Sequence, residues 1–186
     1  MAPAHLTGAG IRRYTADVTT RWDSRPRSLA LSGLIGFGVG FGFVEAAVVY
    51  YLRTVLGSPH TYALGHYRVL VNFGAITFIS SLHNFLPSHL ARVEVVREAA
   101  TILMLAGVAL AAGRTARARW GAFLIGFSCW DLSYYLFLRI ISGWPTSLFT
   151  RDVFFLIPVP WIGPVITPLV IFSVALVVGV RLYQRG

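Results

Sequence analysis

Three carboxylates lie inside long apolar stretches of the sequence. Glu45 lies within "GLIGFGVGFGFVEAAVVYY", Glu98 within "VREAATILML" and Asp131 within "FLIGFSCWDLSYYLFLRII". An ionisable side chain at the centre of a membrane-spanning helix costs about 2.5–3.5 kcal/mol on insertion scales, so such residues are usually paired or functional. These three carboxylates are therefore the first candidates for chemistry.

Other polar residues accompany the three carboxylates. Ser128, Asp131, Tyr135 and Arg139 follow one another at spacings of three, four and four residues, which places them along one helix face. Arg97 directly precedes Glu98. We predict a buried polar cluster, open to the outer side where Asp152 and His89 also lie, whose members are Glu45, Glu98, Asp131, Tyr135, Arg97 and Arg139.

Two interpretations of this cluster remain open. In the first, Glu45 or Asp131 pairs with Arg97 or Arg139, and these ion pairs fix the register of the helices. In the second, the carboxylates form a site, which is either a proton carrier or a metal centre. The metal ligands would be Glu45, Glu98 and Asp131 with His83 or His89, a set that suits Mn, Fe or Zn. The sequence has no E-x-x-H spacing, so the cofactor is unknown and a divalent metal is the candidate.

The composition is that of a membrane protein. Of 186 residues, 56% are hydrophobic and 12% are charged, which is too apolar for a soluble domain of this length. The net charge is +9, but every basic residue is arginine and most of them flank apolar runs instead of forming one patch. We therefore expect a lipid bilayer, and no nucleic acid, as the partner. The single cysteine, Cys129, excludes an intrachain disulfide.

Four apolar runs are long enough to position the cluster inside a bilayer. The length of each lies within the range of about 17 to 25 residues that a spanning helix needs. We predict an all-α, polytopic membrane helical bundle in which residues 29–186 form one membrane domain after a flexible cytoplasmic tail, residues 1–28. The predicted spans cover about residues 29–52, 95–112, 120–141 and 161–182.

Two further apolar segments are too polar or too rich in proline to be clear spans. Residues 68–86 contain two asparagines, two serines and a histidine, and we predict an interfacial or re-entrant helix at the outer face. Residues 153–160 include Pro158 and Pro160, which resist regular helix and predict a short re-entrant turn.

The arginines predict the orientation of the spans. With four spans, ten arginines lie on the side of the two termini and six on the other side, whereas a fifth span at residues 68–86 weakens the ratio to nine against seven. Because arginine is retained in cytoplasmic loops, we predict four spans with both termini in the cytoplasm.

Glycines in the first span predict close helix packing. Gly38 and Gly42 precede Glu45 by seven and three residues and so lie on its helix face. Small residues at such spacings let two helices approach closely. We expect this face to point into the bundle or to meet another membrane protein.

The segment "CWDLSYYLFLRIISGWPTSLFTRDVFFLIPVPWIGPVITP", residues 129–168, resembles multi-pass bacterial inner-membrane proteins of uncharacterised activity. The resemblance implies an inner-membrane location in a bacterium and transfers no activity. Our leading functional hypothesis is a non-catalytic membrane subunit or assembly component that binds other membrane proteins or a second copy of itself. The alternatives are a membrane metal or redox enzyme and a small proton-coupled transporter, so enzymatic activity stays open.

Overall fold

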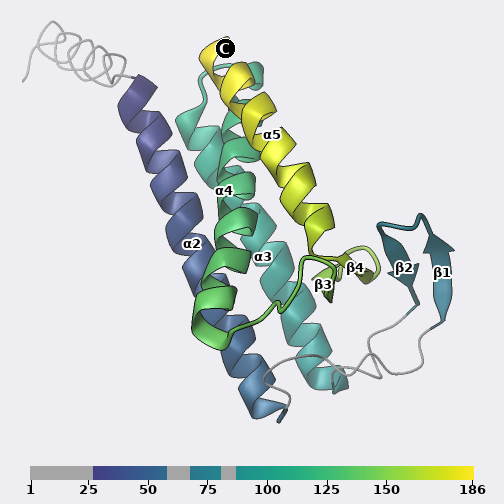
Figure 1. The fold of residues 1–186 in the computed structure, drawn as a ribbon. Coiled ribbons are helices and arrows are strands. Elements are labelled where there is room, and N and C mark those ends of the chain that lie inside the picture. Colours follow the sequence, from purple (N-terminus) through teal and green to yellow (C-terminus); the bar gives the residue numbers. More distant parts are fainter. Residues whose placement is uncertain (1–26, 58–67, 81–86) are drawn as a thin grey trace, which may run out of the picture.

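Four long helices form the body of the molecule in the computed structural model, which describes residues 27–57, 68–80 and 87–186. The helices are α2 (Arg27–Val55), α3 (Ser88–Ala112), α4 (Ala116–Ser142) and α5 (Ile166–Gln184). Successive helices run in opposite directions (Figure 1). All four are long and apolar enough to cross a membrane, as predicted from the sequence. Of the predicted tail, residues 1–26 lie outside the described part, and the last two residues belong to α2.

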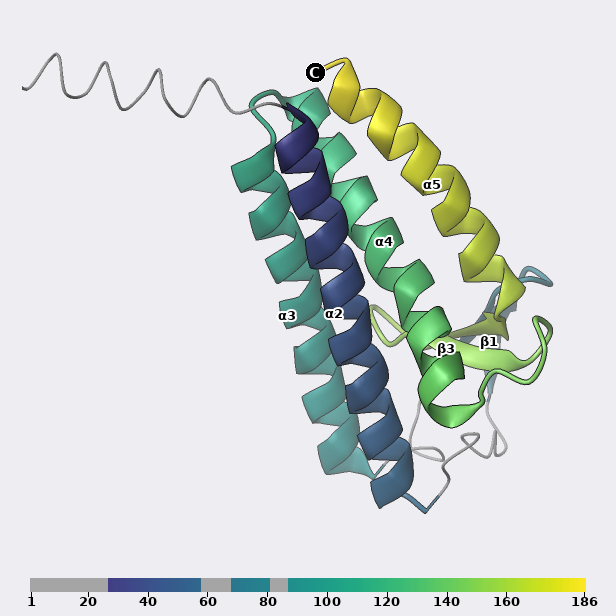
Figure 2. The ribbon, with the colours of Figure 1, turned by 60° about the vertical axis from the view of Figure 1, so that its left-hand side comes forward.

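Helix α4 is the central element of the bundle. It packs against α2, α3 and α5, while α2 and α3 make few contacts with each other. Figure 2 shows α4 lying between the α2 and α3 pair and α5. One half of the bundle is filled by an apolar cluster of small and branched side chains: Leu34, Ala109, Ala118, Ala122, Ile125, Cys129 and Tyr183. The central position of α4 explains why half of its most apolar stretch is buried, a larger share than in the other three helices.

Glycine allows α2 to approach α4 closely. A Cβ atom at Gly38 would lie 2.6 Å from the Cβ of Cys129 and 2.8 Å from the carbonyl oxygen of Gly126. A Cβ atom at Gly42 would lie 2.6 Å from the carbonyl oxygen of Trp130. The face that carries these glycines therefore points into the bundle, which was one of the two expectations.

A small antiparallel sheet lies beside the bundle, next to the start of α5 (Figure 1). Its strands are β1 (Val69–Asn72), β2 (Thr77–Ile79), β3 (Arg151–Phe155) and β4 (Trp161–Pro164), in the order β1-β2-β4-β3. The chain is therefore mostly helical but not all-α. The sheet brings a hairpin near the middle of the sequence beside the segment that precedes α5 (Figure 1).

Three predictions about these segments differ from the structure, because strands form where helix or turn was expected. The helix predicted over residues 68–86 is wrong in its described part, where β-branched residues flank a turn at Gly74, whose φ is +78°. The short re-entrant turn predicted over residues 153–160 instead begins as part of strand β3. The last helix begins at Ile166 instead of residue 161, because Trp161–Pro164 pairs with β2 and β3.

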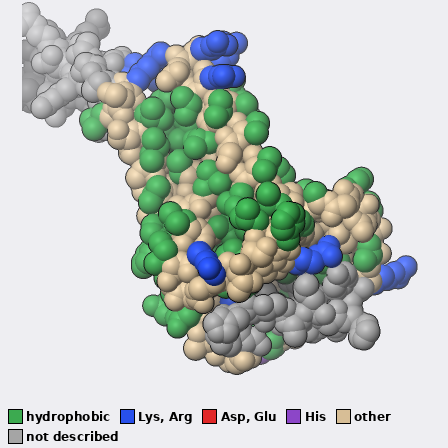
Figure 3. All heavy atoms as spheres, viewed as in Figure 1, with side chains coloured by type: hydrophobic (Ala, Val, Ile, Leu, Met, Phe, Trp, Pro, Cys, Tyr) green, Lys and Arg blue, Asp and Glu red, His purple; other side chains and the backbone are tan. Residues whose placement is uncertain are grey.

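The two ends of the bundle differ in charge. The start of α2, the connection between α3 and α4, and the end of α5 lie at the end opposite the sheet (Figure 1). In the space-filling view, arginines lie at this end and also in the half that contains the sheet, and hydrophobic side chains cover much of the body between them (Figure 3). The chain segments that meet there contribute Arg27, Arg114, Arg117, Arg119, Arg181 and Arg185. We call this the arginine end and the opposite one the sheet end.

Candidate functional site

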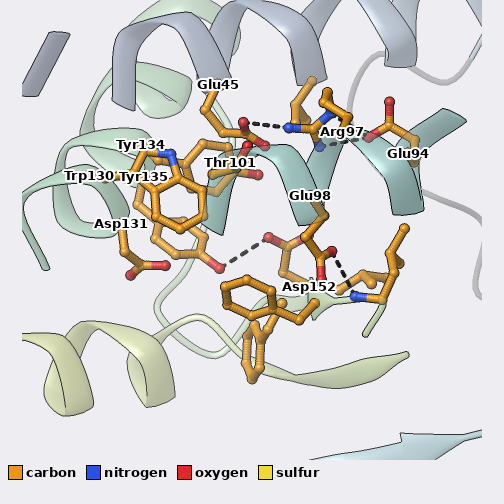
Figure 4. A pocket seen from close by; sticks show the side chains of 15 residues that line it. Glu45, Glu94, Arg97, Glu98, Thr101, Trp130, Asp131, Tyr134, Tyr135 and Asp152 are labelled. Atoms are coloured by element: carbon orange, nitrogen blue, oxygen red, sulfur yellow. Dashed lines mark hydrogen bonds and ion pairs between the residues drawn. The ribbon is translucent and has the colours of Figure 1, made fainter. Parts of the chain in front are cut away.

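A polar pocket of about 80 Å³ lies where α2, α3 and α4 meet β3, in the half of the bundle nearer the sheet (Figure 4). Its polar lining combines five carboxylates with one arginine, one threonine and two tyrosines. Aromatic and aliphatic side chains from α4 and β3 complete the wall. The lining residues are Glu45, Val49, Glu94, Arg97, Glu98, Thr101, Trp130, Asp131, Tyr134, Tyr135, Asp152, Val153, Phe154, Phe155 and Leu156.

Arg97 holds two of the carboxylates. Its Nη1 donates a hydrogen bond to Glu45 Oε2 at 2.5 Å, and its Nη2 donates to Glu94 Oε2 at 2.6 Å. The first bond joins α3 to α2, whereas the second lies within α3 at a spacing of three residues. The charge of Arg97 is thus already engaged by two carboxylates at the pocket (Figure 4).

Glu98 holds the chain that leaves β3. Its carboxylate accepts hydrogen bonds from the backbone N–H groups of Leu156 at 2.8 Å and Ile157 at 3.1 Å. A turn that ends a strand leaves such donors without a partner in the sheet, and a carboxylate satisfies two of them at once. Glu98 therefore fixes the wall of the pocket to α3.

Asp152 takes part in a buried network at the wall of the pocket. Its Oδ1 lies 3.4 Å from Nη2 of Arg53, and its Oδ2 accepts a hydrogen bond of 3.1 Å from the hydroxyl of Tyr135. The guanidinium of Arg53 also lies 3.9 Å from the ring centre of Trp144. Burial raises the pKa of Asp152 to about 6, although Arg53 and the hydrogen bonds oppose the increase. Desolvation therefore costs this carboxylate more than its partners return.

Asp131 is treated differently from the other carboxylates. Asp131 lies in the middle of α4 and is only 8% exposed to solvent. Its Oδ2 has no hydrogen-bond partner among the described residues. The side chain lines the pocket (Figure 4). Neither Arg97 nor Arg139 pairs with it in the described structure. The pocket thus contains one buried carboxylate oxygen that the described protein leaves unsatisfied.

The structure brings five of the six predicted cluster residues to one pocket: Glu45, Arg97, Glu98, Asp131 and Tyr135. The sixth, Arg139, is exposed, and its guanidinium donates a hydrogen bond to the carbonyl oxygen of Gly143 at the end of α4. Whether the pocket binds anything stays a prediction. Of the two predicted partners for Arg97, the described structure has Glu45 and not Asp131.

The predicted metal ligands do not converge in the described part of the chain. Within residues 27–57, 68–80 and 87–186, no three His, Cys, Asp or Glu side chains are arranged to hold a metal ion. His83 lies outside the described residues. The predicted set of Glu45, Glu98, Asp131 and His83 is therefore not assembled by its three described members alone.

Arg53 is the residue of this site that the sequence did not reveal. It stands at the end of an apolar run, where arginine ordinarily extends to the membrane surface. In the fold it is 1% exposed, because the segment around Trp144 and Asp152 covers it. Its distance of 99 residues from Asp152 leaves no local signal for the pair. No family model, curated protein or solved structure matches this chain, so a function has to be inferred from the site itself.

Proposed function

We propose that this chain is a four-span protein of a bacterial inner membrane that binds a small cation in its acidic pocket, as a non-catalytic membrane component. The four apolar helices and the exposed hydrophobic side chains along them support insertion in a bilayer. Over the full sequence, ten arginines lie on the side of the two termini and six on the other side, which supports a cytoplasmic position for both termini. The pocket would then open in the outer half. The resemblance of residues 129–168 to bacterial inner-membrane proteins supports the compartment.

One observation carries the proposed binding function, namely the unsatisfied carboxylate of Asp131. A buried charge inside a bilayer needs a compensating charge or a proton. Arg97 is engaged by Glu45 and Glu94, and Arg53 by Asp152 and Trp144. A cation that enters the pocket would supply the charge that Asp131 lacks.

The surroundings of the pocket favour binding over conduction or covalent catalysis. Between the pocket and the arginine end lies the apolar cluster around Ile125, so the described residues offer no continuous polar path through the bundle. In the described lining there is no serine, cysteine or histidine, the usual groups of a nucleophile and its base. A pocket that is closed on one side fits a receptor for a solute.

Thermal unfolding of the full chain in detergent tests cation binding. The panel contains Na⁺, K⁺, Mg²⁺, Ca²⁺, Mn²⁺, Zn²⁺ and ethylammonium at constant ionic strength. At least one cation should raise the midpoint with a saturable dependence on concentration, because a ligand of the native state stabilises it. The variant Asp131→Asn should lose the effect, and Ser128→Ala, one turn away and outside the pocket lining, should retain it. The proposal is wrong if no cation shifts the parent.

A second candidate function, association with another membrane protein or a second copy, is favoured by the remaining glycines of α2. A Cβ atom at Gly36 or Gly40 would meet nothing within 4 Å, so the second G-x-x-x-G spacing faces outward. Replacing both with leucine should abolish association in nanodiscs or detergent while the monomer stays folded. Equal sedimentation behaviour of parent and variant would exclude this use of the face.

A further inference from the structure

The aromatic wall of the pocket narrows the class of cation. Trp130 and Tyr134 are one turn apart on α4, and both line the pocket. The ring of Phe155 lies 6.1 Å from that of Trp130 with an angle of 70° between the planes. The ring centres of Tyr134 and Tyr135 lie 4.7 Å apart, with an angle of 65° between the ring planes. Trp130 also packs against Phe41 and Phe127. These rings form one aromatic side of the pocket lining, and an aromatic face directed at an organic cation attracts it.

The unsatisfied carboxylate oxygen of Asp131 restricts further which cations the pocket can bind. Asp131 Oδ2 has no donor among the described residues, so a ligand that satisfies it must carry an N–H or O–H group. A quaternary ammonium has no such group. A bare divalent metal requires several converging oxygen ligands, and the described carboxylates are not arranged in that way. A protonated amine meets both requirements, because it donates N–H and presents carbon to aromatic faces.

Resting on the cation-binding function above, we propose that the pocket binds a protonated primary amine, whose ammonium donates to Asp131 and whose first carbons lie against Trp130 and Phe155. The volume of about 80 Å³ is near half of the cavity that holds benzene, so it accommodates about three or four non-hydrogen atoms. The same ammonium occurs in soluble alkylamines and in the ethanolamine headgroup of phospholipids.

Competition among cations tests the class with the parent protein alone. Isothermal titration of the full chain in detergent uses propylammonium, ethanolammonium, tetramethylammonium and Mg²⁺. The primary amines should bind at least tenfold more tightly than tetramethylammonium and than Mg²⁺. Binding of Mg²⁺ or tetramethylammonium without the amines would overturn the amine assignment and leave cation binding standing. If none of the cations binds, both the amine assignment and the proposed function are wrong.

Two variants test the assigned contacts, each against a matched control on the same helix. Asp131→Asn should weaken propylammonium binding about 10- to 100-fold, as expected for loss of a charged hydrogen bond, whereas Ser128→Ala should bind as the parent does. Trp130→Leu should weaken it about 3- to 30-fold, whereas Trp120→Leu, at the exposed start of α4, should not. Parent-like binding by either pocket variant would overturn the geometry. If a pocket variant does not fold, the selectivity of the parent decides.

Nanodiscs distinguish the two sources of the amine. The full chain is placed in phosphatidylcholine discs with and without phosphatidylethanolamine, and propylammonium is titrated into each. Competition by the ethanolamine lipid, absent with phosphatidylcholine alone, assigns the headgroup as ligand. Equal binding in both discs assigns a soluble amine. Carbodiimide modifies a free carboxyl group, so a bound ethanolamine headgroup should protect Asp131 from it. The proposal is overturned if propylammonium binds in neither disc and the ethanolamine lipid does not protect Asp131.

Discussion

At the scale of single residues, two buried carboxylates of the site differ in their hydrogen-bond partners. Asp152 has Arg53, Tyr135 and a backbone N–H as partners, whereas Asp131 has an oxygen without one in the described structure. A carboxylate with several donors serves the structure, because its removal leaves those donors unpaired. A buried carboxylate oxygen without a donor, such as Oδ2 of Asp131, lowers the stability of the folded protein until a ligand or a proton compensates it.

Asp131→Asn should therefore not lower the midpoint of thermal unfolding in the absence of ligand. The amide keeps the shape of the side chain and removes a charge that has no partner. Arg97→Gln is the informative comparison, because it leaves Glu45 and Glu94 without their cation and should cost about 1–3 kcal/mol. A loss of stability in Asp131→Asn equal to that in Arg97→Gln would restore the ion-pair interpretation of Asp131.

Asp152 should make stability depend on pH. Its pKa is about 6 in the native state against an ordinary value of 3.8, so between these values the native state binds a proton that the unfolded chain has released. Its contribution to the free energy of unfolding is complete below about pH 3.8 and is lost as pH rises through about 6, a change of about 3 kcal/mol. Chemical unfolding between pH 4 and 7 should show this decline in the parent, and Asp152→Asn should remove that part of it. Parallel pH profiles for the two proteins would contradict the assignment.

At the scale of elements, α4 holds the fold together through close backbone contact with its neighbours. The contact with α2 depends on Gly38 and Gly42, and the contact with α5 depends on Gly121 and Gly179, whose added Cβ atoms would also meet backbone atoms. Helices in a bilayer gain little from the hydrophobic effect between them, so such close packing is a main source of association. The pocket depends on it, since Glu45 and Asp131 belong to this helix pair.

Leucine at Gly38 or Gly42 should separate α2 from α4 and displace Glu45. Overpacking of this kind costs about 1–3 kcal/mol or more per site, because the nearest atoms belong to the backbone or to a short side chain. Gly36→Leu and Gly40→Leu provide the matched control, since those positions are open. Thermal unfolding in detergent should fall for the first pair and stay unchanged for the second. Equal behaviour of the two pairs would show that α2 packs otherwise.

Glu98→Ala should loosen the chain that leaves β3. The partly buried backbone N–H groups of Leu156 and Ile157 would lose their acceptor, at a cost of about 1 kcal/mol for each. Hydrogen exchange at these two amides should accelerate strongly, while amides in the middle of α5 keep their protection. Unchanged exchange at Leu156 and Ile157 would show that Glu98 does not hold this turn.

At the scale of the whole molecule, the charge difference between the ends gives the bundle a direction. The arginine end contains the start of α2, the connection of α3 to α4 and the end of α5 (Figure 1). The sheet end contains the pocket, which β3 helps to line. With the four arginines that precede Arg27 counted, ten arginines lie on the side of the arginine end and six on the other side. Arginine resists transfer across a membrane, so this count predicts which side each end faces. The pocket and the sheet would then meet the outer side.

Cysteine labelling from outside the cell tests this direction. In a Cys129→Ser background, a single cysteine at Thr146, between α4 and β3, should react with a membrane-impermeant maleimide. A single cysteine at Thr115, in the connection between α3 and α4, should react only after the membrane is permeabilised. Labelling of Thr115 from outside would reverse the orientation and require a different number of spans before it.

The sequence by itself determined the helical elements and their apolar character. Runs of about 20 apolar residues can satisfy their backbone hydrogen bonds in a bilayer only as helices, so the bounds of α2 and α4 could be predicted within a few residues. Helix α3 begins at Ser88, seven residues before its predicted start at residue 95. Helical spacing also identified Gly38 and Gly42 as a packing face and brought Asp131 and Tyr135 to one side of α4. These are local properties, which a period of 3.6 residues carries in the sequence.

The tertiary structure decided the sheet and the pairing of the charges. Strands β2 and β4 are more than 80 residues apart in sequence, and each is only three or four residues long, so neither contains enough pattern to be distinguished from a short helix. The choice of Glu45 over Asp131 as the partner of Arg97, and of Asp152 for Arg53, depends on how helices rotate and where β3 crosses them. Such distances between remote side chains have no local signal, because they arise only when the bundle and the sheet have packed together.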